Sequence, residues 1–325
     1  MRQARRPNTD MLLADIGGTN TRVALASGGA VSPDSIRRYS NRKHGSFFSV
    51  LEKYGRKMGR IDCNSACVAV AGPVRNGRAH MTNLEWVLDL DTLRQATKSG
   101  NVAILNDLEA QGYALGHIPD KHLLPVQGPP CNMPGATRLV VGLGTGFNTA
   151  AVFERADTRL VTPSESGQMN FPALGREECA FCEYVAERHG FPSLDRILSG
   201  RGLETLFAWR RQLSGSAEQL RAAEIIQAVA RNDNRHATQT TRLFVRMLGT
   251  VAGNLALTYL PFGGLYLTGG VARAIAPYLT RFGFHESFEN KGRFREFMRG
   301  FPVFVIDDDY AALTGCAAYL NGYSG

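Results

Sequence analysis

The stretch Leu12–Leu25, "LLADIGGTNTRVAL", predicts two buried strands joined by a tight polar turn. The first apolar run contains Asp15 near its end, and the second follows Arg22. The turn between them consists of small or polar residues: Gly17, Gly18, Thr19 and Asn20. Glycines expose backbone N–H groups to phosphate oxygens because no Cβ stands in the way. Asp15 is a candidate ligand for hydrated Mg²⁺, while a turn that only stabilises the hairpin is the alternative.

A second stretch of the same kind, "LVVGLGTGFNTAAVF", occupies residues 139–153. Its turn contains Gly144, Thr145 and Gly146, and the same two interpretations apply. A Walker loop is excluded because its G-x-x-x-x-G-K-[ST] pattern is missing from the sequence. A dinucleotide fingerprint is excluded because Phe147 stands in place of its last glycine and a strand follows. Two such hairpins, one opening each half of the chain, predict a duplicated α/β architecture.

The rest of the chain indicates how the two halves are organised. Strands and helices alternate up to residue 117, whereas mainly helices are predicted later, over 204–212, 216–231 and 235–259. The loop at 118–138, rich in proline, glycine and asparagine, is the best candidate domain boundary. A chain of 325 residues with 44% hydrophobic residues can form one large domain or two medium ones.

The net charge of +8 raises the question of nucleic-acid binding. The lysines and arginines are dispersed, however, and the densest basic segment, residues 290–300, has acidic neighbours and apolar residues at helical spacing. A solvated helix face is therefore favoured over a nucleic-acid patch, and no nucleic-acid partner is expected. A modest positive field also suits a phosphorylated small molecule.

Long apolar runs and a secretory signal are both missing from the sequence. No apolar run approaches the roughly 18 residues that a membrane span needs, so no membrane partner is expected. The start, "MRQARRPNTD", has no apolar segment after its arginines, which predicts a cytoplasmic protein. The six cysteines fit reduced, mostly buried thiols. The pair Cys179 and Cys182 favours two structural cysteines on one helix, with metal-ligand spacing as the alternative.

Three further segments carry candidate chemistry. Asn106 and Asp107 lie where a buried strand meets a helix, so Asp107 is either a general base or part of a helix N-cap. The segment "PSESGQMNF" at 163–171 offers carboxylate and amide groups to a polyhydroxyl ligand, or is an exposed turn. The segment "LTGGVA" at 267–272 predicts a strand, two glycines and a helix N-terminus, suited to an anion or to helix–strand packing.

Taken together, these segments resemble the bacterial glucokinases, of the hexokinase, actin and Hsp70-type ATPase superfamily. The resemblance runs nearly end to end and includes "DIGGTNTR", "AVAGPV…MTNLEW", "LNDLEAQ", "GLGTG", "ESGQMNF", "RILSGRGLE", "LTGGV" and "FENKGRF". It implies an α/β, two-lobed actin-like ATPase (ribonuclease-H-like) fold, with mixed β-sheets flanked by helices and the active site in the interdomain cleft. The implied small lobe is 1–117 plus 308–325, and the large lobe is 118–307. The branch with a cysteine-rich zinc motif is disfavoured because that motif is missing.

The resemblance also implies an activity: phosphorylation of glucose by ATP at the 6-hydroxyl, the first step of glycolysis, by a homodimer. Asp107 would be the general base, and Mg²⁺ would be held near Asp15 through water. The implied sugar-binding residues are Asn83, Asn106, Glu165, Gln168 and Asp195. The implied nucleotide-binding residues are Asp15, Gly17, Gly18, Thr19, Asn20, Gly144, Thr145, Gly146, Gly269 and Gly270.

Three positions depart from the family pattern. Gln168 stands where related glucokinases have histidine, Asp195 where they have glutamate, and Asn148 where the second turn has a glycine. The changes leave the kinase chemistry in place and bear on sugar preference. Two alternatives therefore stay open: a kinase for another hexose (mannose, fructose or an amino sugar), and a non-catalytic sugar- or ATP-binding regulator.

Overall fold

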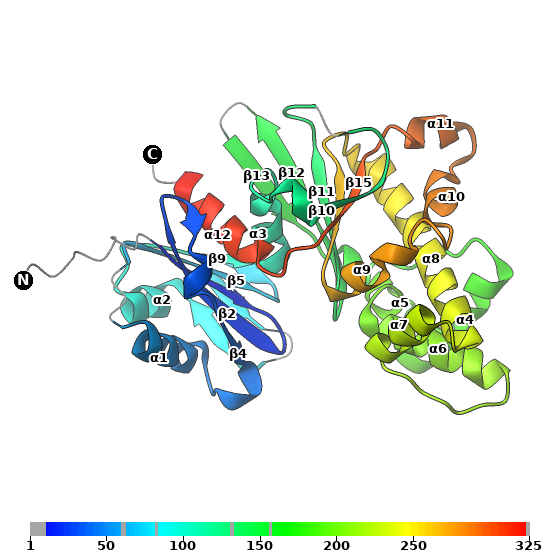
Figure 1. The fold of residues 1–325 in the computed structure, drawn as a ribbon, viewed down its shortest axis with the longest axis horizontal. Coiled ribbons are helices and arrows are strands. Elements are labelled where there is room, and N and C mark those ends of the chain that lie inside the picture. Colours follow the sequence, from blue (N-terminus) through cyan, green and yellow to red (C-terminus); the bar gives the residue numbers. More distant parts are fainter. Residues whose placement is uncertain (1–10, 60–62, 82–83, 131–132, 156–157, 323–325) are drawn as a thin grey trace, which may run out of the picture. The chain divides into compact units, whose positions relative to one another are not determined.

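The computed structural model describes residues 11–59, 63–81, 84–130, 133–155 and 158–322. These residues divide into two compact units. Unit 1 comprises the described residues up to Pro119 together with those from Asp308 onward, and unit 2 comprises those from Asp120 to Asp307. Each unit contains a mixed β-sheet with helices packed on it (Figure 1).

Unit 1 is built around the first hairpin. Its strands are β1 (Met11–Ile16), β2 (Asn20–Ser27), β3 (Ala30–Val31), β4 (Arg37–Ser40), β5 (Ser65–Val70), β6 (Val74–Arg75), β7 (Arg78–His80), β8 (Val87–Asp89) and β9 (Asn101–Asn106). Its helices are η1 (Pro33–Ser35), η2 (Asn41–Lys43), α1 (Phe47–Met58), α2 (Leu90–Thr97), α3 (Asp107–Ala114) and α12 (Ala311–Gly322). Strand β1 pairs antiparallel with β2 and parallel with β5, and β5 pairs parallel with β9. Helices α3 and α12 lie on one face of this sheet, and α1 and α2 on the other (Figure 1).

Unit 2 is built around the second hairpin. Its strands are β10 (Leu123–Gln127), β11 (Arg138–Leu143), β12 (Phe147–Arg155), β13 (Thr158–Pro163), β14 (Leu265–Thr268) and β15 (Val303–Ile306). Its helices are η3 (Asp120–His122), η4 (Ser166–Gln168), α4 (Arg176–His189), α5 (Leu194–Ile197), α6 (Gly200–Leu213), α7 (Ala222–Arg231), α8 (Arg235–Tyr259), α9 (Gly270–Ile275), η5 (Ala276–Tyr278), α10 (Phe284–Glu289), η6 (Gly292–Phe294) and α11 (Arg295–Met298).

The two sheets repeat one arrangement, which confirms the predicted duplication. In unit 1 the strand order is β2-β1-β5-β9, and in unit 2 it is β12-β11-β14-β15. Each run consists of an antiparallel hairpin followed by two parallel strands. The carboxyl ends of parallel strands meet at one edge of a sheet, where ligand-binding groups tend to collect.

Two sequence predictions need correction. The predicted loop at 118–138 contains strand β10, which pairs antiparallel with β15. The strand was missed because it contains Pro125, and proline argues against a strand. An edge strand such as β10 tolerates proline. The helix predicted over 216–231 begins only at Ala222, whereas α8 has the predicted bounds.

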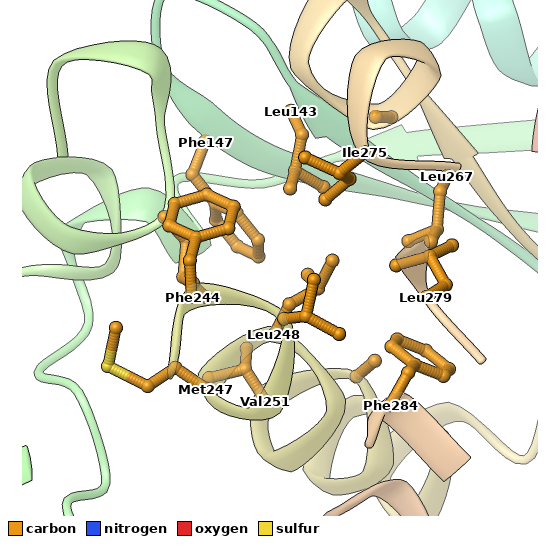
Figure 2. Close-up of a cluster of buried hydrophobic side chains, with 14 of the residues drawn as sticks. Leu143, Phe147, Phe244, Met247, Leu248, Val251, Leu267, Ile275, Leu279 and Phe284 are labelled. Carbon is orange, nitrogen blue, oxygen red and sulfur yellow. The ribbon is translucent and has the colours of Figure 1, made fainter. Parts of the chain in front are cut away.

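The core of unit 2 forms between α8 and the sheet. Helix α8 packs against α6, α7 and α10, and nearly all of its residues from Leu243 to Ala256 are buried. Figure 2 shows part of this core, in which side chains from five segments point toward one another: Leu143, Phe147, Phe244, Leu248, Leu267 and Ile275.

Helix α12 returns from the far end of the chain to pack closely on α3 in unit 1 (Figure 1). Gly315 makes the close approach possible, because a Cβ there would lie 1.7 Å from the carbonyl oxygen of Ala110. The rings of Tyr113 and Tyr319 meet edge to face, 4.9 Å apart. The helix that begins at Asp107 is therefore held by α12.

The cysteines only partly match their prediction. Cys63, Cys67 and Cys316 are buried free thiols. Cys179 and Cys182 lie on one helix, α4, as predicted, but Cys179 is exposed. Among the described residues, no three histidine, cysteine or acidic side chains are placed to hold a metal ion.

The basic segment at 290–300 forms η6 and α11, with Met298 buried. Arg299 pairs with Glu289 at 3.1 Å and with Glu296 at 2.9 Å, so its charge is offset locally. As for membranes, the part of the chain that the structure describes has no helix with the length and apolar character to cross one.

Candidate active site

The first glycine turn is held in shape by a buried asparagine. Gly17 N–H donates to the carbonyl oxygen of Asn20 at 3.0 Å, which closes the turn. Asn41, 2% exposed, donates from Nδ2 to the carbonyl of Gly17 at 2.7 Å and from its backbone N–H to that of Thr19 at 2.9 Å. Thr21 Oγ1 donates in turn to Asn41 Oδ1 at 2.8 Å. The turn is therefore preorganised, and sequence analysis missed Asn41.

Polar side chains of unit 1 lie at the carboxyl edge of its sheet. Ile16 pairs with Val70, and Val70 with Asn106, so the ends of β1, β5 and β9 are level. Asp15 and Asp107 therefore lie at the same edge. Asp15 Oδ2 accepts a hydrogen bond from Arg22 Nη1 at 2.9 Å.

Asn106 and Asp107 begin helix α3. Asn106 is the N-cap of a capping box, and its Oδ1 accepts from Leu108 N–H at 3.0 Å. Its Nδ2 donates to the carbonyl of Gly72 at 3.1 Å. The predicted N-cap alternative is thus confirmed for Asn106. Asp107 follows the cap, and its Oδ1 shares the same Leu108 N–H at 3.0 Å.

The carboxyl group of Asp107 is electrostatically unusual. Burial, followed by the negative charge of Asp15, raises the pKa of Asp107 to about 7. Burial also raises the pKa of Asp15, and the Arg22 guanidinium opposes this. A carboxyl group that ionises near neutral pH is suited to accept a proton in general base catalysis.

The second glycine turn is anchored from α5 and α6. Gly144 N–H donates to the carbonyl of Gly146 at 3.0 Å, and Gly200 N–H donates to the carbonyl of Gly144 at 2.9 Å. Asp195 Oδ1 accepts from Phe147 N–H at 2.9 Å. A Cβ at Gly146 would lie 2.4 Å from the same oxygen, so a larger residue there would displace the Asp195 carboxylate from Phe147 N–H.

The turn that carries Glu165 and Gln168 packs directly on the start of β12. A Cβ at Gly167 would lie 2.0 Å from the carbonyl oxygen of Phe147. Glu165 and Gln168 are both exposed, whereas Ser166 and Gly167 between them are buried. Unit 2 therefore brings together the second glycine turn, Glu165, Gln168 and Asp195.

Gly269 and Gly270 have different structural roles. Gly269 has φ +104°, and a Cβ there would lie 2.2 Å from the carbonyl oxygen of Leu143, so it serves strand–helix packing. A Cβ at Gly270 would meet nothing within 4 Å. Gly270 thus leaves open space beside the second turn.

The remaining features are one predicted residue that the structure does not describe and one cavity that lies apart from these groups. Asn83, predicted to bind sugar, is outside the described residues. A cavity of about 650 Å³ in unit 1 is lined by residues of α1, α2 and β1, among them Phe48, Leu51 and Thr97. It contains no predicted site residue.

A solved structure with the same fold identifies the class of protein. The structure of a glucokinase from an Antarctic psychrotroph is 29% identical to this chain, covers 95% of it and 98% of its own length, and gives a TM-score of 0.82. The chain therefore has the actin-like ATPase fold of sugar kinases.

Sequence comparisons identify the family. A family model described as Glucokinase matches residues 12–323. The glucokinase of Marinobacter nauticus is 33% identical over 311 residues, 95% of this chain and 97% of its own length. The glucokinase of Caulobacter vibrioides is 34% identical over 314 residues, 95% of each chain. The chain belongs to the glucokinase family.

Proposed function

We propose that this protein transfers the γ-phosphoryl group of ATP to the 6-hydroxyl of glucose, giving glucose 6-phosphate and ADP. The observation that carries the proposal is Asp107, a partly buried carboxyl group whose pKa is raised to about 7, at the carboxyl edge of a sheet that also presents a preorganised glycine turn. Family membership supports the proposal, since the relatives compared above are named glucokinases.

In the proposed reaction, Asp107 accepts the proton of the sugar 6-hydroxyl. The hydroxyl oxygen forms a bond to the γ-phosphorus while the bond from that phosphorus to the β–γ bridging oxygen breaks, and ADP leaves. The glycine turns of both units offer backbone N–H groups to phosphate oxygens. Asn106, Glu165, Gln168 and Asp195 are the proposed sugar-binding residues.

The residues around Asp15 fit a hydrated Mg²⁺ ion. The two carboxyl groups, Asp15 and Asp107, have their pKa raised by burial, so a nearby divalent cation would relieve an unfavourable charge. Mg²⁺ keeps several waters and takes one or two carboxylates, which matches Asp15. When bound, it would neutralise charge on the phosphates.

An assay of ADP release with Mg-ATP across a panel of hexoses tests the proposal. Turnover on glucose is expected to exceed turnover on mannose, fructose and amino sugars. Faster turnover on another hexose would replace glucose as the substrate. Binding of ATP with no sugar-dependent ADP release would favour the regulator, which we disfavour because Asp15, Asp107 and both glycine turns are present.

The pH dependence follows from Asp107. The base must be ionised to accept a proton, so kcat/KM for glucose, measured at Mg-ATP far below saturation so that it reports the free enzyme, is expected to rise through a pKa of about 7 and, at pH 6, to be roughly tenfold below its plateau. In the unliganded protein, Asp15→Asn removes a like charge and is expected to lower the pKa of Asp107. Carboxyl ¹³C NMR titration of both proteins measures this shift directly. An Asp107 pKa near 4 in the unsubstituted protein would contradict it.

Gly144→Ala is expected to weaken ATP binding without destabilising the fold. A Cβ there meets nothing within 4 Å of protein, so the space it fills is open to a phosphate. The added methyl group would keep a phosphate oxygen away from the other backbone N–H groups of the turn, and loss of one hydrogen bond to a charged phosphate predicts a KM for ATP raised roughly tenfold or more. Gly175→Ala, also in open space in unit 2, is the matched control. Equal KM values for ATP in both variants would contradict the assignment of Gly144 to the nucleotide site.

We also propose a cytoplasmic location and a homodimer. The dimer rests on the resemblance to bacterial glucokinases. Light scattering coupled to size-exclusion chromatography measures the mass, and a species of about 35.5 kDa would show a monomer.

A further inference from the structure

Asn148 joins the second glycine turn to the turn that carries Glu165. It lies at the second position of β12, and its side-chain Nδ2 donates to Glu165 Oε2 at 3.2 Å. Its Oδ1 accepts from Ser166 Oγ at 3.1 Å and from Ser164 Oγ at 3.3 Å. Both halves of the amide are therefore used on residues 164–166.

The backbone of that turn is fixed by other contacts. Thr149 Oγ1 lies 2.8 Å from Ser164 Oγ and 2.9 Å from Ser166 Oγ. Gly167 fits against the carbonyl of Phe147. These contacts hold the turn on β12, but none of them reaches the carboxylate of Glu165.

The Glu165 side chain depends on Asn148 for its orientation. Within the described residues, Asn148 is the only side chain that hydrogen-bonds the carboxylate, and Oε1 has no hydrogen-bond partner there. An exposed glutamate loses rotamer entropy when a ligand fixes it. A neighbour that holds one oxygen in advance lowers this loss and leaves the other oxygen for a hydroxyl.

Asparagine fits at position 148 without backbone strain. The described non-glycine residues with positive φ are Asn76, Lys98, Asn232 and Leu260, so Asn148 has an ordinary extended backbone. The glycine that the family pattern has here could not make the bond to Glu165. The departure therefore adds a contact toward the sugar-binding turn.

We propose that Asn148 is a positioning residue that orients the Glu165 carboxylate toward the sugar, and so sets the affinity for hexoses rather than for ATP. The proposal rests on the proposed function, in which Glu165 binds the sugar ring. The proposal gives Asn148, the third departure from the family pattern, a role in sugar binding, although its position beside a glycine turn suggests a role in nucleotide binding.

Two variants separate the contribution of the Asn148 side-chain donor from that of its acceptor. Asn148→Gly removes both, and the KM and Kd for glucose are expected to rise roughly three- to tenfold, with the KM for ATP changed less than twofold. Asn148→Asp keeps the acceptor for Ser164 and Ser166 but places a carboxylate against Glu165. It is expected to raise the KM for glucose further, and it supplies the result if Asn148→Gly fails to fold.

A double-mutant cycle with Glu165→Ala shows whether Asn148 acts through Glu165. Adding Asn148→Gly to Glu165→Ala is expected to leave the glucose Kd, measured by isothermal titration calorimetry, unchanged within twofold. A further loss of the same size as in the unsubstituted background would overturn the proposal. So would a rise in the KM for ATP in Asn148→Gly with the KM for glucose unchanged.

The unsubstituted protein tells the two failures apart. If it phosphorylates no hexose, the proposed function is wrong, whatever the Asn148 variants show. If it phosphorylates glucose and the Asn148 variants keep its glucose Kd, only the role of Asn148 is wrong.

Discussion

Asp107→Asn is expected to lower kcat by about 10²- to 10⁴-fold, because an asparagine cannot accept the proton of the sugar hydroxyl. The side chain keeps its shape, and its Oδ1 can still accept from Leu108 N–H, as Asp107 does at 3.0 Å. The KM for glucose is expected to change little. A coupled assay of ADP release, at saturating ATP and glucose, measures kcat.

Stability distinguishes this loss from unfolding. Because burial raises the pKa of Asp107 to about 7, stabilisation by its neutral form is present at low pH and is lost as the pH rises through 7. At pH 8 the neutral asparagine is therefore expected to be at least as stable as the ionised aspartate. Asp91→Asn, at an exposed position of α2, is the matched control and should keep full turnover. Near-normal kcat in Asp107→Asn would disprove the role of Asp107 as base.

Gly315→Ala is expected to lower the free energy of unfolding by about 3 kcal/mol and Tm by roughly 10 °C. The added Cβ would lie 1.7 Å from the carbonyl oxygen of Ala110, so α12 and α3 must separate. Since α3 begins at Asp107, kcat is expected to fall as well. Thermal unfolding followed by circular dichroism measures the first effect, and the ADP assay measures the second.

Gly322→Ala is the control within the same helix. A Cβ at Gly322 meets nothing within 4 Å, and alanine favours helix over glycine. Its Tm is expected to be unchanged or slightly raised. If both variants unfold at the same temperature, the close approach of α12 to α3 does not contribute to stability as proposed.

The structural features that could be predicted from the sequence were those with a local sequence pattern. Apolar runs around glycine-rich turns predicted both hairpins, and apolar periodicity predicted α8 with its observed bounds. Asn106 followed from the preference of asparagine for helix N-caps. The strand β10 was missed because Pro125 is typical of a loop and because its partner strand, β15, is distant in sequence.

The contacts that shape the site could not be predicted in this way. Asn41 reaches Gly17 across 24 residues, and Asn148 reaches Glu165 across 17. Neither segment carries a local signal for such a bond, since the partner of each asparagine lies in another segment of the chain. Likewise, the raised pKa of Asp107 arises from burial and from Asp15, which only the sheet register brings to the same edge.

The return of α12 to unit 1 has a consequence for the order in which the protein is made. About 190 residues separate the two segments of unit 1. At roughly 5–20 residues per second, a ribosome needs about 10–40 s to pass from one to the other. During that time α3 has been synthesised but its partner helix has not, so the nascent chain leaves part of its apolar surface uncovered. Completion of unit 1 therefore waits for α12, whereas unit 2 can fold before it.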